Sequence, residues 1–231
     1  MDVAELDNPF WSSLATRHRG VALRHGEVAR YPASLAPFLG VAHAGVDPVE
    51  GLDALVARDE SVYLLGVAPR VPEGWTLEAF ADLAQMTCTS PIDVIDGPDA
   101  VELTDVHRAD VLALTALVYP HYFRERTMEL GRYFGIYMPD ARGEVRLAAM
   151  IGERLGTDAY QEMSAICTHP DFNGRGYARR LTALLGNDVL AGGRIPFLHV
   201  SHANTRAKRL YEQLGYSHRR DIGFWSLRRS A

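Results

Sequence analysis

The chain has 231 residues, 47% hydrophobic and 23% charged, which is the composition of an ordinary globular protein with one large or two small domains. Its formal net charge of −5 argues against a protein that mainly binds nucleic acid, and no apolar run approaches the ~20 residues that span a bilayer. Two cysteines are too few for a secreted disulfide scaffold, and the acidic N-terminus lacks a signal-peptide core, so we expect a cytoplasmic protein with free thiols.

Prolines divide the first third of the chain into short elements. Residues 61–67 are mostly apolar and typical of a strand. Residues 78–88 carry Phe80, Leu83 and Met86, and this spacing predicts a helix, or a helix that runs into a strand.

Residues 91–98 form a short segment bracketed by proline and glycine, which is typical of a boundary. We therefore expect an N-terminal α/β domain at 1–97 and a second domain at 98–231. Cys88-Thr-Ser-Pro resembles Cys167-Thr-His-Pro, so the first domain is either a degenerate copy of the second or unrelated to it, since such short echoes also arise by chance.

The second half of the chain has a more regular pattern, which predicts the element order βααβββαβαβ. Short turns join three of its strands, so these are expected to form an antiparallel meander. The expected strands are 101–103, 133–138, 145–153, 160–168, 196–200 and one or two within 216–227. The expected helices follow Thr104 or Asp105, cover 124–130, and begin near Ala178 and at Asn204.

Gly174 and Gly176 lie between an expected strand and an expected helix. Glycines allow close backbone approach to a ligand, and the free N–H groups and dipole of a helix N-terminus attract anions, so this turn predicts a pyrophosphate site. The alternative is a tight loop without a ligand. Arg175, Arg179 and Arg180 add positive charge. A dinucleotide-binding fingerprint would need glycine at 179, and a P-loop would need Gly-Lys-Ser/Thr, so neither motif is present.

The run 173–178, Asn-Gly-Arg-Gly-Tyr-Ala, resembles the coenzyme-A-binding motif of the GNAT superfamily, Gln/Arg-x-x-Gly-x-Gly/Ala. Residues 166–170, Ile-Cys-Thr-His-Pro, resemble the end of the strand that precedes this motif in the family. Asn204 with Leu210-Tyr-Glu-Gln-Leu-Gly-Tyr216 resembles a second family signature. The resemblance covers about residues 98–231, and it is nearest to the glycine N-acyltransferase-like subgroup. Asn173 stands where the family has Gln or Arg, so the resemblance does not extend to this side chain.

The resemblance implies an α/β fold of the GNAT type, with a mixed, mostly antiparallel splayed sheet flanked by helices. It also implies acetyl-CoA (coenzyme A) as cofactor, with the acyl thioester between strands 160–168 and 196–200. The residues implied to bind it are Ile166, Cys167, Thr168, Asn173, Gly174, Arg175, Gly176, Tyr177, Ala178, Arg179 and Asn204. Backbone amides of 166–168 would polarise the thioester carbonyl. Asn204 would also cap its helix.

Two proton transfers are then needed, one from the amine and one to the departing thiolate. Tyr211 matches the family's tyrosine acid, and it also lies on an apolar stripe, so packing is the alternative. The base is left open among Glu162, His199 and a water relay. Cys167 is expected to pack in its strand, and His199 with His202 is not expected to form a metal site, because these residues face differently.

The resulting hypothesis is an acyltransferase, an N-acetyltransferase that moves the acetyl group directly to a primary amine in a ternary complex. The alternative is a non-catalytic acyl-CoA-binding or regulatory module. The expected partner is a small-molecule or peptide amine, with no nucleic acid and no membrane, and the protein is expected to be a monomer or homodimer. Residues 119–124 are rich in aromatics and either line the acceptor cleft or form an exposed hinge. We expect the N-terminal third to cover the acceptor side, while the sequence leaves the acceptor itself open.

Overall fold

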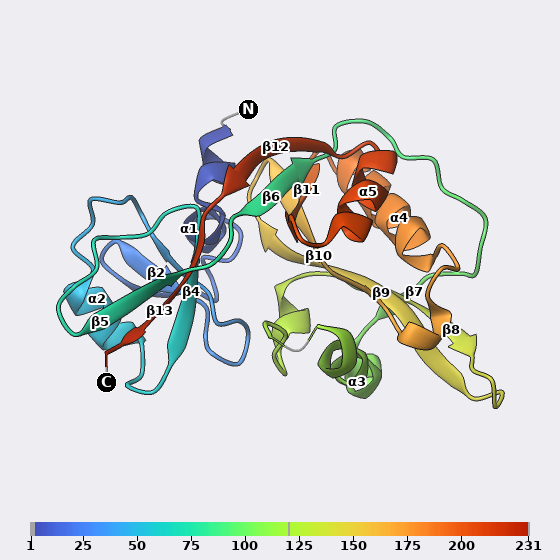
Figure 1. The fold of residues 1–231 in the computed structure, drawn as a ribbon, viewed down its shortest axis with the longest axis horizontal. Helices are drawn as coiled ribbons and strands as arrows, with labels where there is room; N and C mark the ends of the chain where they lie inside the picture. Colours follow the sequence, from blue (N-terminus) through green and yellow to red (C-terminus); the bar gives the residue numbers. More distant parts are fainter. Residues whose placement is uncertain (1–2, 120, 231) are drawn as a thin grey trace.

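The computed structural model describes residues 3–119 and 121–230 as two groups of elements placed side by side (Figure 1). The α-helices are α1 (Pro9–Ala15), α2 (Val49–Leu55), α3 (Arg108–Val118), α4 (Tyr177–Ala191) and α5 (Thr205–Gln213). The 3-10 helices are η1 (Val3–Asp7), η2 (Asp105–His107), η3 (Thr127–Leu130) and η4 (Pro170–Phe172). None of these described helices is both long enough and apolar enough to cross a membrane.

The larger group contains a seven-stranded sheet in the order β12-β6-β11-β10-β9-β8-β7. All neighbours are antiparallel except β10 and β11, which run parallel, so the prediction of a mixed, mostly antiparallel sheet is confirmed. The meander is confirmed as β8-β9-β10, and the helix expected at 124–130 is the shorter η3. The strands are β6 (Leu83–Thr87), β7 (Val101–Leu103), β8 (Tyr133–Pro139), β9 (Val145–Gly156), β10 (Tyr160–Thr168), β11 (Ile195–Ser201) and β12 (Ser217–Ile222).

Helices cover both faces of this sheet. Figure 1 shows α4 and α5 together on one side and α3 on the other. Leu181, Leu185 and Val189 of α4 lie in one buried cluster with the sheet, as the apolar spacing predicted. Val111 and Leu114 of α3 belong to a second cluster on the opposite face. The sheet is therefore the middle layer, and both of its faces are buried.

The smaller group consists of two three-stranded sheets packed with α1 and α2. One sheet has the order β1-β2-β3 and the other the order β4-β13-β5. The strands are β1 (Leu23–His25), β2 (Val28–Arg30), β3 (Leu39–Val41), β4 (Ser61–Leu65), β5 (Trp75–Ala79) and β13 (Phe224–Arg229). β4 confirms the strand expected at 61–67.

The two groups exchange strands. β6, from the first third of the chain, lies between β12 and β11, while the C-terminal β13 lies between β4 and β5. The helix predicted within 78–88 is wrong, because these residues end β5 and form β6. Residue 97 is therefore not a boundary between sheets, and the division into domains at 1–97 and 98–231 stays a prediction.

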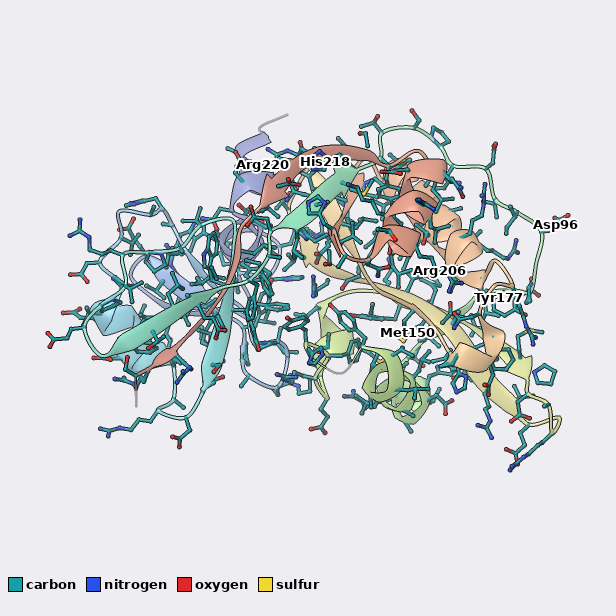
Figure 2. The ribbon with its side chains drawn as sticks, viewed as in Figure 1. Asp96, Met150, Tyr177, Arg206, His218 and Arg220 are labelled. Atoms are coloured by element: carbon teal, nitrogen blue, oxygen red, sulfur yellow. The ribbon has the colours of Figure 1, made fainter. Side chains whose placement is uncertain are left out.

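The loop from β6 to β7 passes around the outer side of α5 and α4 (Figure 1), and Asp96 marks its outer part in Figure 2. Asn187 of α4 holds this loop through both backbone groups of Ile92, at 2.7 and 2.8 Å. Arg180, also of α4, donates to the carbonyl oxygens of Ile95 and Pro98. The loop forms no helix or strand in the described structure, and side chains of α4 hold it in position.

Candidate functional site

β10 and β11 diverge at the centre of the large sheet. Their parallel pairing ends at Glu162 opposite Phe197, and beyond this point β10 pairs with β9 alone among the described strands. A register shift between Ser164 and Cys167 leaves one extra residue on β10, and Ala165 there has a φ of +50°. A β-bulge and a left-handed alanine are local strain of the kind found at functional sites. The divergence opens a passage through the sheet.

On the α4–α5 face, this passage widens into a cavity of about 570 Å³. Its walls include every residue expected to bind the cofactor: Ile166, Cys167, Thr168, Asn173, Gly174, Arg175, Gly176, Tyr177, Ala178, Arg179 and Asn204. Figure 2 labels Tyr177 at the start of α4 and Arg206 in the first turn of α5, the two helix ends that flank this opening. We call this cavity the glycine-turn cavity.

The glycine turn has the backbone geometry of an anion cradle. Gly174 and Gly176 have φ values of +79° and +80°, and Gly176 is the N-cap of α4. The first amide of this helix that donates a hydrogen bond is that of Arg180, which bonds to the carbonyl oxygen of Gly176 at 2.9 Å. Within the described part of the chain, no group accepts a hydrogen bond from the amides of residues 174–179. These N–H groups and the helix dipole therefore remain available to a ligand.

Four arginines add positive charge around the glycine-turn cavity, and two of them, Arg206 and Arg209, were missed in the sequence. They are three residues apart at the start of an expected helix, so they lie on the same helix face. This spacing could have identified them from the sequence. The Nε of Arg179 is buried and has no hydrogen-bond partner. Arg175 stacks on Phe172, with 5.0 Å from the guanidinium carbon to the ring centre. Arg180 holds the β6–β7 loop and lies outside the cavity walls.

On the opposite face of the sheet, the same passage opens into a second cavity of about 400 Å³. Its walls include α1, the end of α3, and residues of β4 and β13, so the smaller group of elements closes this side. We call it the aromatic cavity, because phenylalanine and tyrosine rings make up much of its wall. The two cavities share Ile166, Cys167, Asn204 and Tyr211.

Tyr211 lies on α5 at the junction of the two cavities. Burial raises the pKa of its phenol above the ordinary value, so the hydroxyl keeps its proton at neutral pH. Asn204 caps the same helix by accepting a hydrogen bond from the Ala207 amide at 3.1 Å. Cys167 also lies at the junction, and burial raises the pKa of its thiol to about 12, so it is protonated and a poor nucleophile.

The structure brings Glu162 and His199 together, although the sequence offered them as alternatives. His199 Nδ1 lies 2.8 Å from Glu162 Oε1. Arg154 of β9 donates from Nε and Nη2 to the two carboxylate oxygens, at 2.7 and 2.8 Å, and the Leu155 amide adds a longer contact. Burial would raise the pKa of Glu162, but the charge and hydrogen bonds of Arg154 and contact with His199 lower it to about 2.

Gln85 of β6 fixes the tautomer of His199. Its side-chain oxygen accepts from Arg219, so its Nε2 faces the Leu6 carbonyl oxygen at 2.9 Å and His199 Nε2 at 3.0 Å. His199 Nε2 is therefore the acceptor in this contact, and Nδ1 carries the proton that points to Glu162. His202 is elsewhere, bonded to Asp221 at 2.8 Å.

Arg154 and Gln85 had no motif to identify them in the sequence. Arg154 and Glu162 flank the short turn between β9 and β10. Opposite charges on two such strands often pair, and this pattern could have identified Arg154 from the sequence. Gln85 had none, because its place beside His199 depends on β6 pairing with β11 from far along the chain. The segment 119–124 divides: Tyr119 and Tyr122 line the aromatic cavity, Phe123 packs on Tyr133, and Pro120 lies outside the described residues.

Known proteins share this architecture. The model of the FR47-like protein family matches residues 135–225. A protein from Novosphingobium aromaticivorans, described as an acetyltransferase of the GNAT family, is 31% identical over 98% of this chain and 99% of its own, with a TM-score of 0.86. A GCN5-related N-acetyltransferase from Kribbella flavida shares the fold at 16% identity, covering 93% of this chain and 95% of its own, with a TM-score of 0.61. No curated protein matches the chain.

Proposed function

Because this chain belongs to the GNAT family of acetyltransferases, we propose that it transfers the acetyl group of acetyl-CoA directly to a primary amine while both substrates are bound. The observation that carries the proposal is the meeting of two cavities from opposite faces of the sheet where β10 and β11 diverge. Such a passage lets a thioester reach an amine without a covalent enzyme intermediate, and binding both substrates supplies proximity. Membership of the chain in the glycine N-acyltransferase-like subgroup stays a prediction.

The residues of the glycine-turn cavity fit coenzyme A. The amides of 174–179 and the N-terminus of α4 would hold the pyrophosphate, and Arg175, Arg179, Arg206 and Arg209 would neutralise its charge. The buried, unpartnered Nε of Arg179 supports an anionic ligand at this place. The backbone of Ile166 to Thr168 and the side chain of Asn204 would contact the pantetheine arm. Acetyl-CoA supplies the activated acyl carbon that the amine attacks.

Tyr211 is the proposed general acid. Tyr211 lines both cavities at their junction, and the raised pKa of its phenol keeps the proton available at neutral pH. As the amine nitrogen bonds to the acetyl carbon and the carbon–sulfur bond breaks, Tyr211 gives its proton to the sulfur. The phenolate of Tyr211 then regains a proton from solvent. The proton that the attacking amine loses must be taken by a separate base.

His199 is the favoured base of the two candidates. The pKa of Glu162 is about 2, and its oxygens are already bonded to Arg154 and His199, so its carboxylate is a weak proton acceptor. Glu162 instead orients His199 and would stabilise the imidazolium form. The Nε2 lone pair faces the Gln85 amide, so proton uptake requires this single neutral hydrogen bond to open. A water relay to His199 remains the alternative.

A binding assay and a turnover assay together test the function. We expect the purified protein to bind coenzyme A and to release free thiol from acetyl-CoA when primary amines are added. Tyr211→Phe is expected to lower kcat by about 10²–10⁴-fold, because the acid is lost, and to leave the Kd for coenzyme A unchanged. Tyr137→Phe removes a hydroxyl that is bonded to Asp110, and it serves as the matched control because Tyr137 lines neither cavity.

Two outcomes would contradict the proposal. Coenzyme A binding without thiol release on any amine would favour the non-catalytic acyl-CoA-binding or regulatory module. Wild-type kcat in Tyr211→Phe would remove the assignment of the acid. The cytoplasmic location, the monomeric or homodimeric state and the choice between a small-molecule and a peptide amine stay predictions.

A further inference from the structure

The wall of the aromatic cavity is built from rings that come from distant parts of the chain. They are Phe10, Phe38, Tyr119, Tyr122 and Phe224. Tyr122 is central: its ring centre lies 5.8 Å from that of Phe224, 6.0 Å from Tyr119 and 6.1 Å from Phe38. Aromatic rings at these separations form ordered packing that offers faces and edges to another ring. The cavity is therefore shaped for a planar or bulky apolar group.

The charges in the aromatic cavity cancel. Among the described residues that line it, the formally charged ones are Arg154 and Glu162, and these bind each other through two hydrogen bonds. Among these described lining residues, no carboxylate is left to bind a second ammonium group of a polyamine or an aminoglycoside. The Arg154 guanidinium is committed to Glu162 and stacks 4.9 Å from the Phe38 ring centre, so it is a poor partner for the carboxylate of an amino acid.

The same surroundings help the reaction. Removal of a bound ammonium from water into this cavity disfavours its charged form and so promotes the neutral amine that attacks. A single charge that is lost during the reaction therefore suits this cavity. Any further charge on the acceptor would be buried without an opposite charge to pair with, because Arg154 and Glu162 already pair with each other.

We infer that the acceptor is a primary amine with one charged group, the reacting ammonium, attached to an aromatic or similarly apolar body, as in a 2-arylethylamine. This inference rests on the proposed acetyl transfer and adds the substrate class. The aromatic wall would bind the body of the acceptor, and the amine would point to the junction with the glycine-turn cavity. The amine nitrogen then takes the acetyl group, and the proton balance is that of the proposed reaction.

A panel of four amines tests the inference with the wild-type protein. 2-Phenylethylamine is the reference. Ethylamine removes the ring, phenylalanine adds a carboxylate, and spermidine adds further ammonium groups. With thiol release measured at saturating acetyl-CoA, kcat/KM for 2-phenylethylamine is expected to exceed each of the others by at least about tenfold, because only it matches both the rings and the charge balance.

A variant of Tyr122 links the preference to the cavity. Tyr122→Leu keeps an apolar side chain but removes the central ring, so kcat/KM for 2-phenylethylamine is expected to fall at least about tenfold, with little change for ethylamine. Tyr122→Phe keeps the ring and should keep the preference. Tyr137→Leu, outside both cavities, is the matched control. Coenzyme A binding by each variant verifies that it is folded.

The outcomes separate the two proposals. Thiol release that is fastest with spermidine, phenylalanine or ethylamine would overturn the substrate class and leave the acetyltransferase standing. An unchanged preference in Tyr122→Leu would also overturn it. Coenzyme A binding with no thiol release from any amine would overturn the acetyltransferase, and the substrate class with it.

Discussion

At the scale of single residues, Glu162 has the most unusual environment in the candidate site. Its carboxylate is fully buried, paired with Arg154 and in contact with His199. Its pKa is about 2, against an ordinary value of 4.5. Because the folded state holds the ionised form better than the unfolded chain does, this shift contributes about 3 kcal/mol to stability at neutral pH.

This stability is expected to depend on pH in a definite direction. Because the folded-state pKa is lowered, the contribution is complete above pH 4.5 and is lost as the pH falls towards 2. Denaturant unfolding from pH 6 to 2.5 should show a falling free energy of unfolding, and Glu162→Gln should flatten the part of this slope that belongs to Glu162. The variant should also be less stable at pH 6 by about 3–5 kcal/mol, since Arg154 loses its partner.

Glu129→Gln is the matched control, because Glu129 forms an exposed pair with Arg126. Such surface pairs contribute little to stability, so its slope should stay close to that of the wild type. An equal slope in Glu162→Gln and wild type would contradict the lowered pKa.

The sequence identified Glu162 and His199 as chemically interesting residues, because their positions follow from the strands that carry them. It could not show that they touch, because the contact depends on the register between β10 and β11. It also missed Arg154, which changes Glu162 from a candidate base into a partner of His199. The sequence could therefore predict which residues lie in the site. It could not predict their proton affinities, which decide their roles.

At the scale of elements, α4 is the part of the site that the sequence predicted best. Its start, its apolar face and its glycine-containing ends are all local features. β6 is the opposite case. Ala84, Gln85 and Met86 are buried on both faces of the strand, so no alternation of polar and apolar residues marks it. Its partners, β11 and β12, lie more than a hundred residues away in sequence.

The two ends of α4 allow a test of the cradle. Gly176 and Gly193 have nearly equal φ values, +80° and +76°, so a side chain strains the backbone similarly at both, by about 1–2 kcal/mol. Only Gly176 lines the glycine-turn cavity, and a Cβ there would also lie 2.9 Å from Ile95 Cδ1. Gly176→Val should therefore weaken coenzyme A binding by at least about tenfold, or 1.4 kcal/mol, whereas Gly193→Val should not.

Isothermal titration with coenzyme A measures both variants. Equal affinity in Gly176→Val and wild type would show that the ligand does not approach this turn. Equal weakening in both variants would show that helix stability, and not contact with the ligand, accounts for the effect.

At the scale of the whole molecule, the exchange of β6 and β13 ties the two groups of elements together, because a sheet of each group contains a strand from the other part of the chain. If either group unfolded alone, strands of the other group would lose a neighbour in their sheet. We therefore expect a single cooperative unfolding transition. The three tryptophans report on the smaller group, since Trp11, Trp75 and Trp225 lie on α1, β5 and β13. The far-UV circular dichroism signal comes chiefly from the longer helices α3, α4 and α5 of the larger group.

Urea unfolding followed by both signals tests this expectation. Coincident midpoints are expected, because each group depends on a strand from the other. Separate midpoints would instead indicate two independently stable domains, in agreement with a division at residue 97.

The position of β6 between β12 and β11 also orders events during synthesis. β6 leaves the ribosome long before either neighbour exists, so it cannot take its place until nearly the whole chain is available. Pairing over such sequence distances is slow, and the waiting strand keeps its edges open to other chains. The same arrangement that brings Gln85 beside His199 is therefore expected to make completion of the large sheet a late step of folding.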